Sequence, residues 1–129
     1  MRSALSAVAA VLFVSAVWAA PVPLVTAGKS DYAIYVEARA PSSVQTAATE
    51  LQTYLEKVTG AKLPLVNEPR EPMVCVGANA AATAAKVTTE GLAVEGWRVA
   101  VRGRNLYLLG PDTADGEQKA YLHLGPQFA

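Results

Sequence analysis

The chain has 129 residues, of which 11 are basic and 11 are acidic, so its formal net charge is zero. This balance gives no electrostatic reason to expect a nucleic acid or an anionic membrane surface as a partner. Cys75 is the only cysteine, which excludes an internal disulfide bond.

The first 19 residues have the pattern of a secretory signal peptide. Arg2 precedes an apolar run from Ala4 to Trp18, and Val17-Trp18-Ala19 fits a cleavage site after Ala19. The alternative is an uncleaved anchor, for which the run is short. We therefore expect a secreted or periplasmic protein that has no membrane segment after cleavage. Residues 20–30 would form a leader and residues 31–129 a single domain.

The longest predicted element is a helix between Pro41 and Gly60. Its apolar residues recur at steps of three and four, as on one helix face: Val44, Ala47, Ala48, Leu51, Tyr54, Leu55 and Val58. Gln52 falls on the predicted outer side. Ser42 and Gln45 have the spacing of a capping box, and Gly60 is suited to end the helix. One face of this helix should lie on a sheet.

Short β-type runs flank this helix on both sides. They cover residues 32–36, 63–66 and 73–76. Pro64 restricts the second run to an edge or to a strand start, whereas the third is apolar throughout, as in a strand buried on both faces. Asn79 is placed to cap a second helix over residues 80–87.

The last elements are a hairpin and a possible final helix. Residues 97–102 alternate between apolar and polar and residues 106–109 return, with a turn at 103–105 of two or three residues. Residues 115–124 could form the helix. The order β-α-β-β-α-β-β predicts a mixed α/β (α+β) fold, in which helices pack on a mixed β-sheet.

Several motifs occur along the chain in a fixed order. They are A-x-x-L-x-x-Y-L-x-x-x-T-G at 48–60, A-x-L-P at 61–64, V-G at 76–77, G-W-R-V at 96–99 and L-L-G at 108–110. Over roughly residues 32–112 the chain resembles the N-terminal domain of family 67 α-glucuronidases. The resemblance implies a zincin-like accessory domain without a metal site, related to the domain that precedes the barrel of β-N-acetylhexosaminidases.

The resemblance also implies what the chain lacks. In that family the hairpin leads into a helix and then a catalytic barrel, and the catalytic carboxylates lie in the barrel. No position of this chain matches them, so the resemblance leads us to expect a C-terminal end that is truncated relative to the family. We expect a non-catalytic accessory domain of a carbohydrate-active enzyme, with a downstream glycoside hydrolase barrel or a saccharide as its partner. The alternative is a stand-alone protein that binds a saccharide or a partner at an exposed sheet edge.

The residues give little support to a third hypothesis, that the chain is itself a hydrolase. Glu68 with Glu71, or Asp112 with Asp115, could form an acid–base pair, but neither pair has an apolar setting. Cys75 lies in an apolar run, where a thiol behaves as a small hydrophobe. His123 has no ligand partner at metal spacing, so we expect neither a metal nor a cofactor.

Aromatic and basic residues are the remaining candidates for ligand binding. Trp97, Arg98 and Arg102 are the candidate ligand-binding residues, because an aromatic ring can stack on a sugar and an arginine can bind a uronic acid. The competing interpretation places Trp97 and the strand tyrosines in the core or at its rim, and the arginines on a solvated face.

Overall fold

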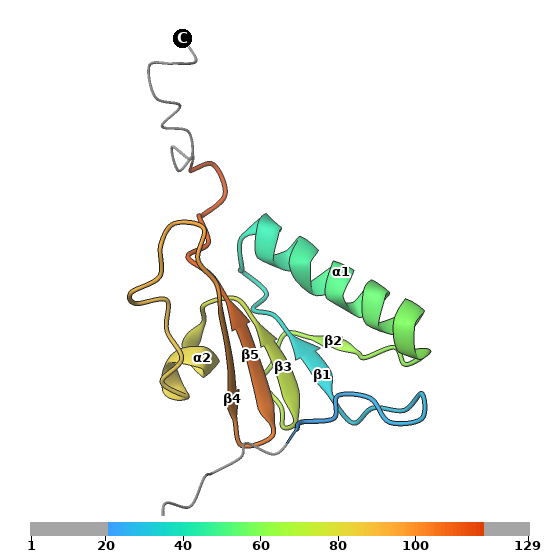
Figure 1. The fold of residues 1–129 in the computed structure, drawn as a ribbon. Coiled ribbons are helices and arrows are strands. Elements are labelled where there is room, and N and C mark those ends of the chain that lie inside the picture. The colour runs from blue at the N-terminus through green and yellow to red at the C-terminus, as the bar shows by residue number, and fades with distance from the viewer. Residues whose placement is uncertain (1–20, 118–129) are drawn as a thin grey trace, which may run out of the picture.

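The computed structural model describes residues 21–117 as a five-stranded mixed sheet with one helix on each side (Figure 1). The elements are β1 (Ala33–Tyr35), α1 (Ser42–Thr59), β2 (Leu65–Val66), β3 (Met73–Val76), α2 (Ala80–Ala84), β4 (Arg98–Arg102) and β5 (Asn105–Leu109). Their order is the predicted one, and the mixed α/β class is confirmed.

The strands lie in the order β2-β1-β3-β5-β4. β1, β2, β3 and β5 are parallel, and β4 is antiparallel to β5. Parallel neighbours need a crossover connection, which α1 provides between β1 and β2. β2 is an edge strand, as Pro64 requires, and β4 is the other edge. The β4–β5 turn has two residues, because Arg102 pairs with Asn105.

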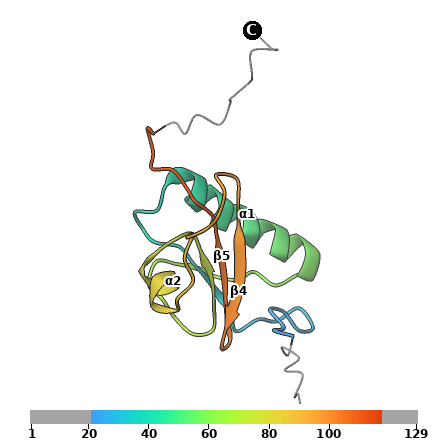
Figure 2. The ribbon, with the colours of Figure 1, turned by 60° about the vertical axis from the view of Figure 1, so that its left-hand side comes forward.

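Alternation along the central strands builds a separate core on each face. Ile34 and Val74 pack with Val44 and Ala48 of α1 in the first core. Cys75 packs with Tyr35, Tyr107 and Ala82 of α2 in the second. All four residues of β3 are buried, as the apolar run predicts. Figure 2 shows α1 and α2 on opposite sides of the sheet.

The start of α1 differs from the prediction. Neither Ser42 nor Gln45 forms a capping box, and Pro41 occupies the N-cap position without a side-chain bond. Instead, the backbone N–H of Ser42 donates to Asp115 Oδ1 at 2.9 Å, and its hydroxyl donates to the same atom at 2.6 Å. The Gln45 amide donates to the Glu37 carbonyl at 2.8 Å. The helix is therefore capped by a carboxylate from the far end of the domain. Gly60 ends the helix with a left-handed φ of 76°, as expected.

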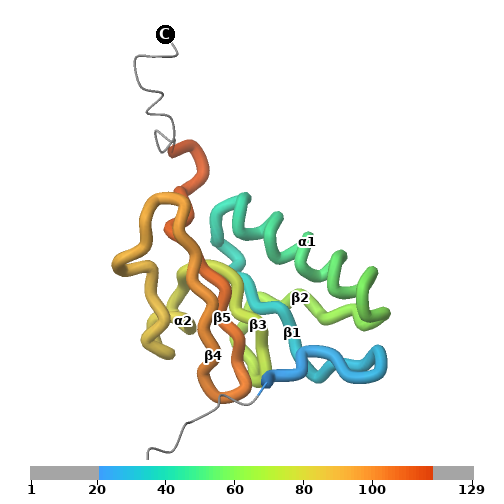
Figure 3. Tube along the Cα trace, in the orientation of Figure 1, coloured from blue at the N-terminus to red at the C-terminus, as the bar shows by residue number. Residues whose placement is uncertain are grey.

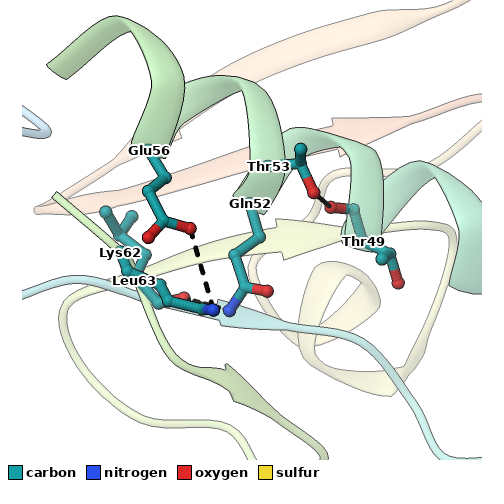
Figure 4. Close-up of polar contacts among 6 residues, drawn as sticks. All are labelled: Thr49, Gln52, Thr53, Glu56, Lys62 and Leu63. Carbon is teal, nitrogen blue, oxygen red and sulfur yellow. Dashed lines mark hydrogen bonds and ion pairs between the residues drawn. The ribbon is translucent and has the colours of Figure 1, made fainter. Parts of the chain in front are cut away.

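Gln52 does not lie on an outer face of α1, so that prediction is wrong. Its side-chain amide donates to the Leu63 carbonyl at 2.6 Å, and the residue is half-buried. Figure 4 shows Gln52 reaching down from α1 to the segment before β2, next to the 3.7 Å ion pair of Glu56 with Lys62. This edge of the helix is held by polar contacts to the following loop.

The segments at the two ends of the described chain extend beyond the sheet. Within the predicted leader, Val22, Leu24 and Val25 pack against the first core, so these residues belong to the packed fold. Asp115 and Gly116 form a turn and do not begin a helix. The predicted signal peptide, most of the predicted final helix and His123 lie outside the described residues.

Candidate functional site

One surface of the domain is apolar and uncovered among the described residues. Trp97, Val99 and Val101 are 74%, 52% and 44% exposed. A groove of about 320 Å³ separates Trp97 and Val99 from Ala47 and Leu51 of α1. We call the whole surface the open apolar face. Its residues are Ala47, Leu51, Tyr54 and Val58 from α1, and Trp97, Val99, Val101, Leu106 and Leu108 from the hairpin.

The open apolar face arises because α1 covers only part of the sheet. α1 packs on β1, β2 and β3, and does not extend over β4 (Figure 1). The apolar stripe of α1 is wider than the surface it covers. Val44 and Ala48, at the centre of the stripe, are buried. Tyr54 and Val58, at the edge of the stripe, are 60% and 82% exposed. On the hairpin, Val99 pairs with Leu108 and Val101 with Leu106, which places these side chains on one face.

Trp97 and the two candidate arginines point to opposite faces of the hairpin, although Arg98 also borders the groove beside Trp97. Successive residues of a strand point to opposite faces, so Arg98 and Arg102 lie on the α2 side. Arg98 donates to the backbone carbonyls of Thr88 and Glu90, which holds the connection before β4. Arg102 is exposed at the end of the hairpin. The Arg98 guanidinium is thus bound to loop carbonyls, whereas the Trp97 side chain is exposed and is neither core nor rim.

The tyrosines on or beside the strands are structural, as the competing interpretation predicted. Tyr32, Tyr35 and Tyr107 are buried, and the Tyr32 hydroxyl donates to the Arg104 carbonyl at 2.7 Å. Tyr54 is the exposed tyrosine of the open apolar face, and the Lys57 ammonium lies 5.0 Å from its ring centre. Tyr54 and Trp97 are therefore the aromatic side chains that this face presents to a partner.

The two acidic pairs lie in different settings, and Asp112 and Asp115 line one open hollow together. Glu68 and Glu71 are exposed on the loop between β2 and β3. Asp115 is bound at the start of α1, where the hydroxyl and backbone N–H of Ser42 lower the pKa of its carboxyl group. Asp115 is thus held as an ionised cap rather than as a proton donor.

Cys75 is a buried thiol, as predicted. Its Sγ lies 3.2 Å from the side-chain nitrogen of Asn79, and burial raises the pKa of the thiol despite this contact. A raised pKa keeps the group as the neutral thiol, whereas a nucleophilic cysteine needs the thiolate. Asn79 in turn accepts from the Ala82 N–H at 3.0 Å and caps α2.

A second hollow, which the sequence reasoning missed, lies at the carboxyl ends of β1, β3 and β5. Open α/β sheets often bind ligands at this edge, where the chain crosses from one face to the other. The hollow has a volume of about 180 Å³ and is lined by Glu37, Arg39, Asn79 and Asp112 among others. The signal was present in Glu37, Asn79 and Asp112, which follow the ends of β1, β3 and β5 by two or three residues. Asn79 is the buried amide residue of this hollow, and its side chain already caps α2.

Within residues 21–117 no three His, Cys, Asp or Glu side chains lie close enough together to hold a metal ion. No helix in this same range is both long and apolar enough to span a bilayer. No protein-family model, curated protein or solved structure matches the chain. The zincin-like relationship and the resemblance to α-glucuronidases therefore stay predictions.

Proposed function

We propose that this chain is a secreted, non-catalytic accessory domain of a carbohydrate-active enzyme, similar to the domain at the N-terminus of family 67 α-glucuronidases. One observation carries the non-catalytic part. The side chains best suited to chemistry are used to hold the fold: Arg98 binds two loop carbonyls, Asp115 caps α1 and Cys75 is buried against Asn79. The order of motifs along residues 48–110 supports the association with carbohydrate-active enzymes.

Hydrolysis assays on the purified chain from residue 20 onward test this proposal. We expect no turnover of aryl-glucuronides, aryl-hexosaminides or xylo-oligosaccharides that carry uronic acids. Turnover that survives repeated purification and is lost in Glu68→Gln or Glu71→Gln would overturn it. The coding DNA beyond the Ala129 codon gives a positive test, because an accessory domain should be followed, in some reading frame, by a glycoside hydrolase barrel.

The alternative function is saccharide binding on the open apolar face. The observation in its favour is the exposed indole of Trp97, since exposed aromatic rings stack on the apolar faces of other molecules. Electrophoresis through gels that contain glucuronoxylan separates the two functions. Retardation that Trp97→Ala abolishes and Arg102→Ala leaves unchanged would favour saccharide binding. Unretarded migration is the result expected of the accessory domain.

A further inference from the structure

The hollow at the carboxyl ends of β1, β3 and β5 lies where neighbouring strands send the chain to opposite faces of the sheet. β1 and β3 are adjacent and parallel. After β1 the chain continues into α1, which packs on the first core, and after β3 it continues into α2, which packs on the second (Figure 3). In open α/β sheets, ligands bind in the crevice beyond two such strands. The fold therefore forms a crevice of this kind beyond the ends of β1 and β3.

Two opposite charges from the connection between β1 and α1 line this hollow. Glu37 is half-buried and Arg39 is exposed, and Asp112 adds a second carboxylate from the chain after β5. Neither the Glu37 carboxylate nor the Arg39 guanidinium forms a hydrogen bond or an ion pair with any of residues 21–117. A charge that is partly removed from water is stabilised by a counter-charge. The hollow therefore presents a carboxylate and a guanidinium that a ligand can pair with.

Hydrogen bonds fix the connection that carries both charges. The Ala40 N–H donates to the Glu37 carbonyl at 3.0 Å, and the side-chain amide of Gln45 donates to the same carbonyl at 2.8 Å. The Gln45 amide also lies 3.3 Å from the Ala38 carbonyl oxygen. A site whose backbone is already ordered loses less conformational freedom when a ligand binds. The backbone positions of Glu37 and Arg39 are therefore set before binding.

We propose that this hollow binds a small zwitterion, namely a free α-amino acid with a short aliphatic side chain. The ammonium group of the ligand donates to the Glu37 carboxylate, and its carboxylate accepts from the Arg39 guanidinium, both as charge-assisted hydrogen bonds. Pro41 and Val76 offer apolar surface to its side chain. The volume of about 180 Å³ lies below the about 300–1,000 Å³ typical of sites for drug-sized ligands, which restricts the hollow to a small molecule.

Other small ligands suit the hollow less well. None of the described residues that line it is aromatic, so a sugar ring finds no side chain on which to stack. A simple anion meets the carboxylates of Glu37 and Asp112, and a simple cation leaves the Arg39 guanidinium without a counter-charge. A ligand that carries both charges matches both signs of the lining.

Titration of the isotopically labelled chain from residue 20 onward with L-alanine tests the proposal by nuclear magnetic resonance. We expect saturable shifts of the backbone amide signals around Gly77, with a dissociation constant in the millimolar range. Glu37→Gln and Arg39→Gln should each weaken binding at least about tenfold, because each removes one charge-assisted contact. The matched controls Glu50→Gln and Arg104→Gln make the same changes at exposed positions outside the hollow and should leave the affinity unchanged.

Two partial ligands test the proposal on the unmodified chain, so the outcome does not depend on how any variant folds. L-Alaninamide lacks the carboxylate and propionate lacks the ammonium group, and each should bind at least about tenfold more weakly than L-alanine. Equal binding of all three, or no saturable shift with L-alanine up to about 50 mM, would overturn the proposal. Tighter binding of D-xylose at the same amides would overturn it too and assign the hollow to a sugar. The inference does not rest on the proposed function, since hydrolysis is measured separately.

Discussion

Gly77→Ala is expected to be among the most damaging single-methyl changes in this domain. Gly77 directly follows β3 and has a φ of 87°, and an added Cβ would lie 2.7 Å from Cγ1 of Val44. The left-handed backbone costs an alanine about 1–2 kcal/mol. Forcing a methyl group against a packed side chain costs about 1–3 kcal/mol more. The free energy of unfolding should therefore fall by roughly 2–5 kcal/mol, a large part of the roughly 5–15 kcal/mol typical of a domain.

Two further variants separate the backbone cost from the clash. Gly60 has a similar φ of 76° but open space around it, so Gly60→Ala should lose only the backbone cost of about 1–2 kcal/mol. In a Val44→Ala background the clash is removed, and adding Gly77→Ala should then cost about as much as Gly60→Ala. Urea unfolding of the four variants and the parent gives these differences. If Gly77→Ala is no more damaging than Gly60→Ala, the packing of α1 against the end of β3 is wrong.

Three other predictions concern the polar contacts that hold the helices. Gln52→Ala should lower the free energy of unfolding by about 0.5–1.5 kcal/mol, because it removes a half-buried hydrogen bond to a loop carbonyl. The control Glu50→Ala, at an exposed position, should change it by no more than about 0.5 kcal/mol, and equal effects of the two variants in urea melts would contradict the contact. Asn79→Ala removes the cap of α2 and should lower the free energy of unfolding by about 0.5–2 kcal/mol. Asn79→Asp keeps a hydrogen-bond acceptor and should lower it by less, and the reverse order in thermal melts would contradict the cap. The pKa of Asp115 is lowered by its bonds from Ser42, so the stability that this carboxylate adds is present above its unfolded pKa of about 3.9 and is lost as the pH falls through the lower folded value. The stability difference between the parent and Asp115→Ala should therefore shrink between pH 6 and strongly acidic pH, and a difference independent of pH would refute the assignment.

The elements that local patterns define were predictable from the sequence. Four consecutive apolar residues from Met73 to Val76 gave β3, which is buried on both faces. Asn79 was identified as a cap, and its side chain does accept from the N–H of Ala82. Gly60 was identified as the end of α1. In each case the signal and the structure it specifies lie within a few residues, so tertiary context could not change the outcome.

The failures all depend on contacts between distant parts of the chain. Ser42 and Gln45 have the right spacing for a capping box, but Asp115 lies 73 residues further on and competes for the same N–H. Gln52 was assigned to the outer side because it is polar, yet the chain returns beneath it at Leu63. The sequence pattern marks an apolar stripe but does not say how much of it a sheet will cover.

The surroundings of the candidate ligand-binding residues could not be predicted for a related reason. Alternation along β4 correctly separates Trp97 from Arg98 and Arg102, but it does not say which side the rest of the chain covers. The loop from Thr88 to Glu90 lies against Arg98 and leaves the apolar side of the strand uncovered among residues 21–117. The open apolar face therefore could not be recognised before the strand order and the position of α1 were known.

The central claim is that the side chains best suited to chemistry hold the fold of the described domain. Urea unfolding of Arg98→Ala beside Arg102→Ala tests it most directly. We expect Arg98→Ala to lower the free energy of unfolding, because it removes the bonds to the Thr88 and Glu90 carbonyls, and the exposed Arg102→Ala to leave it almost unchanged. Equal free energies of unfolding for the two variants would contradict the claim.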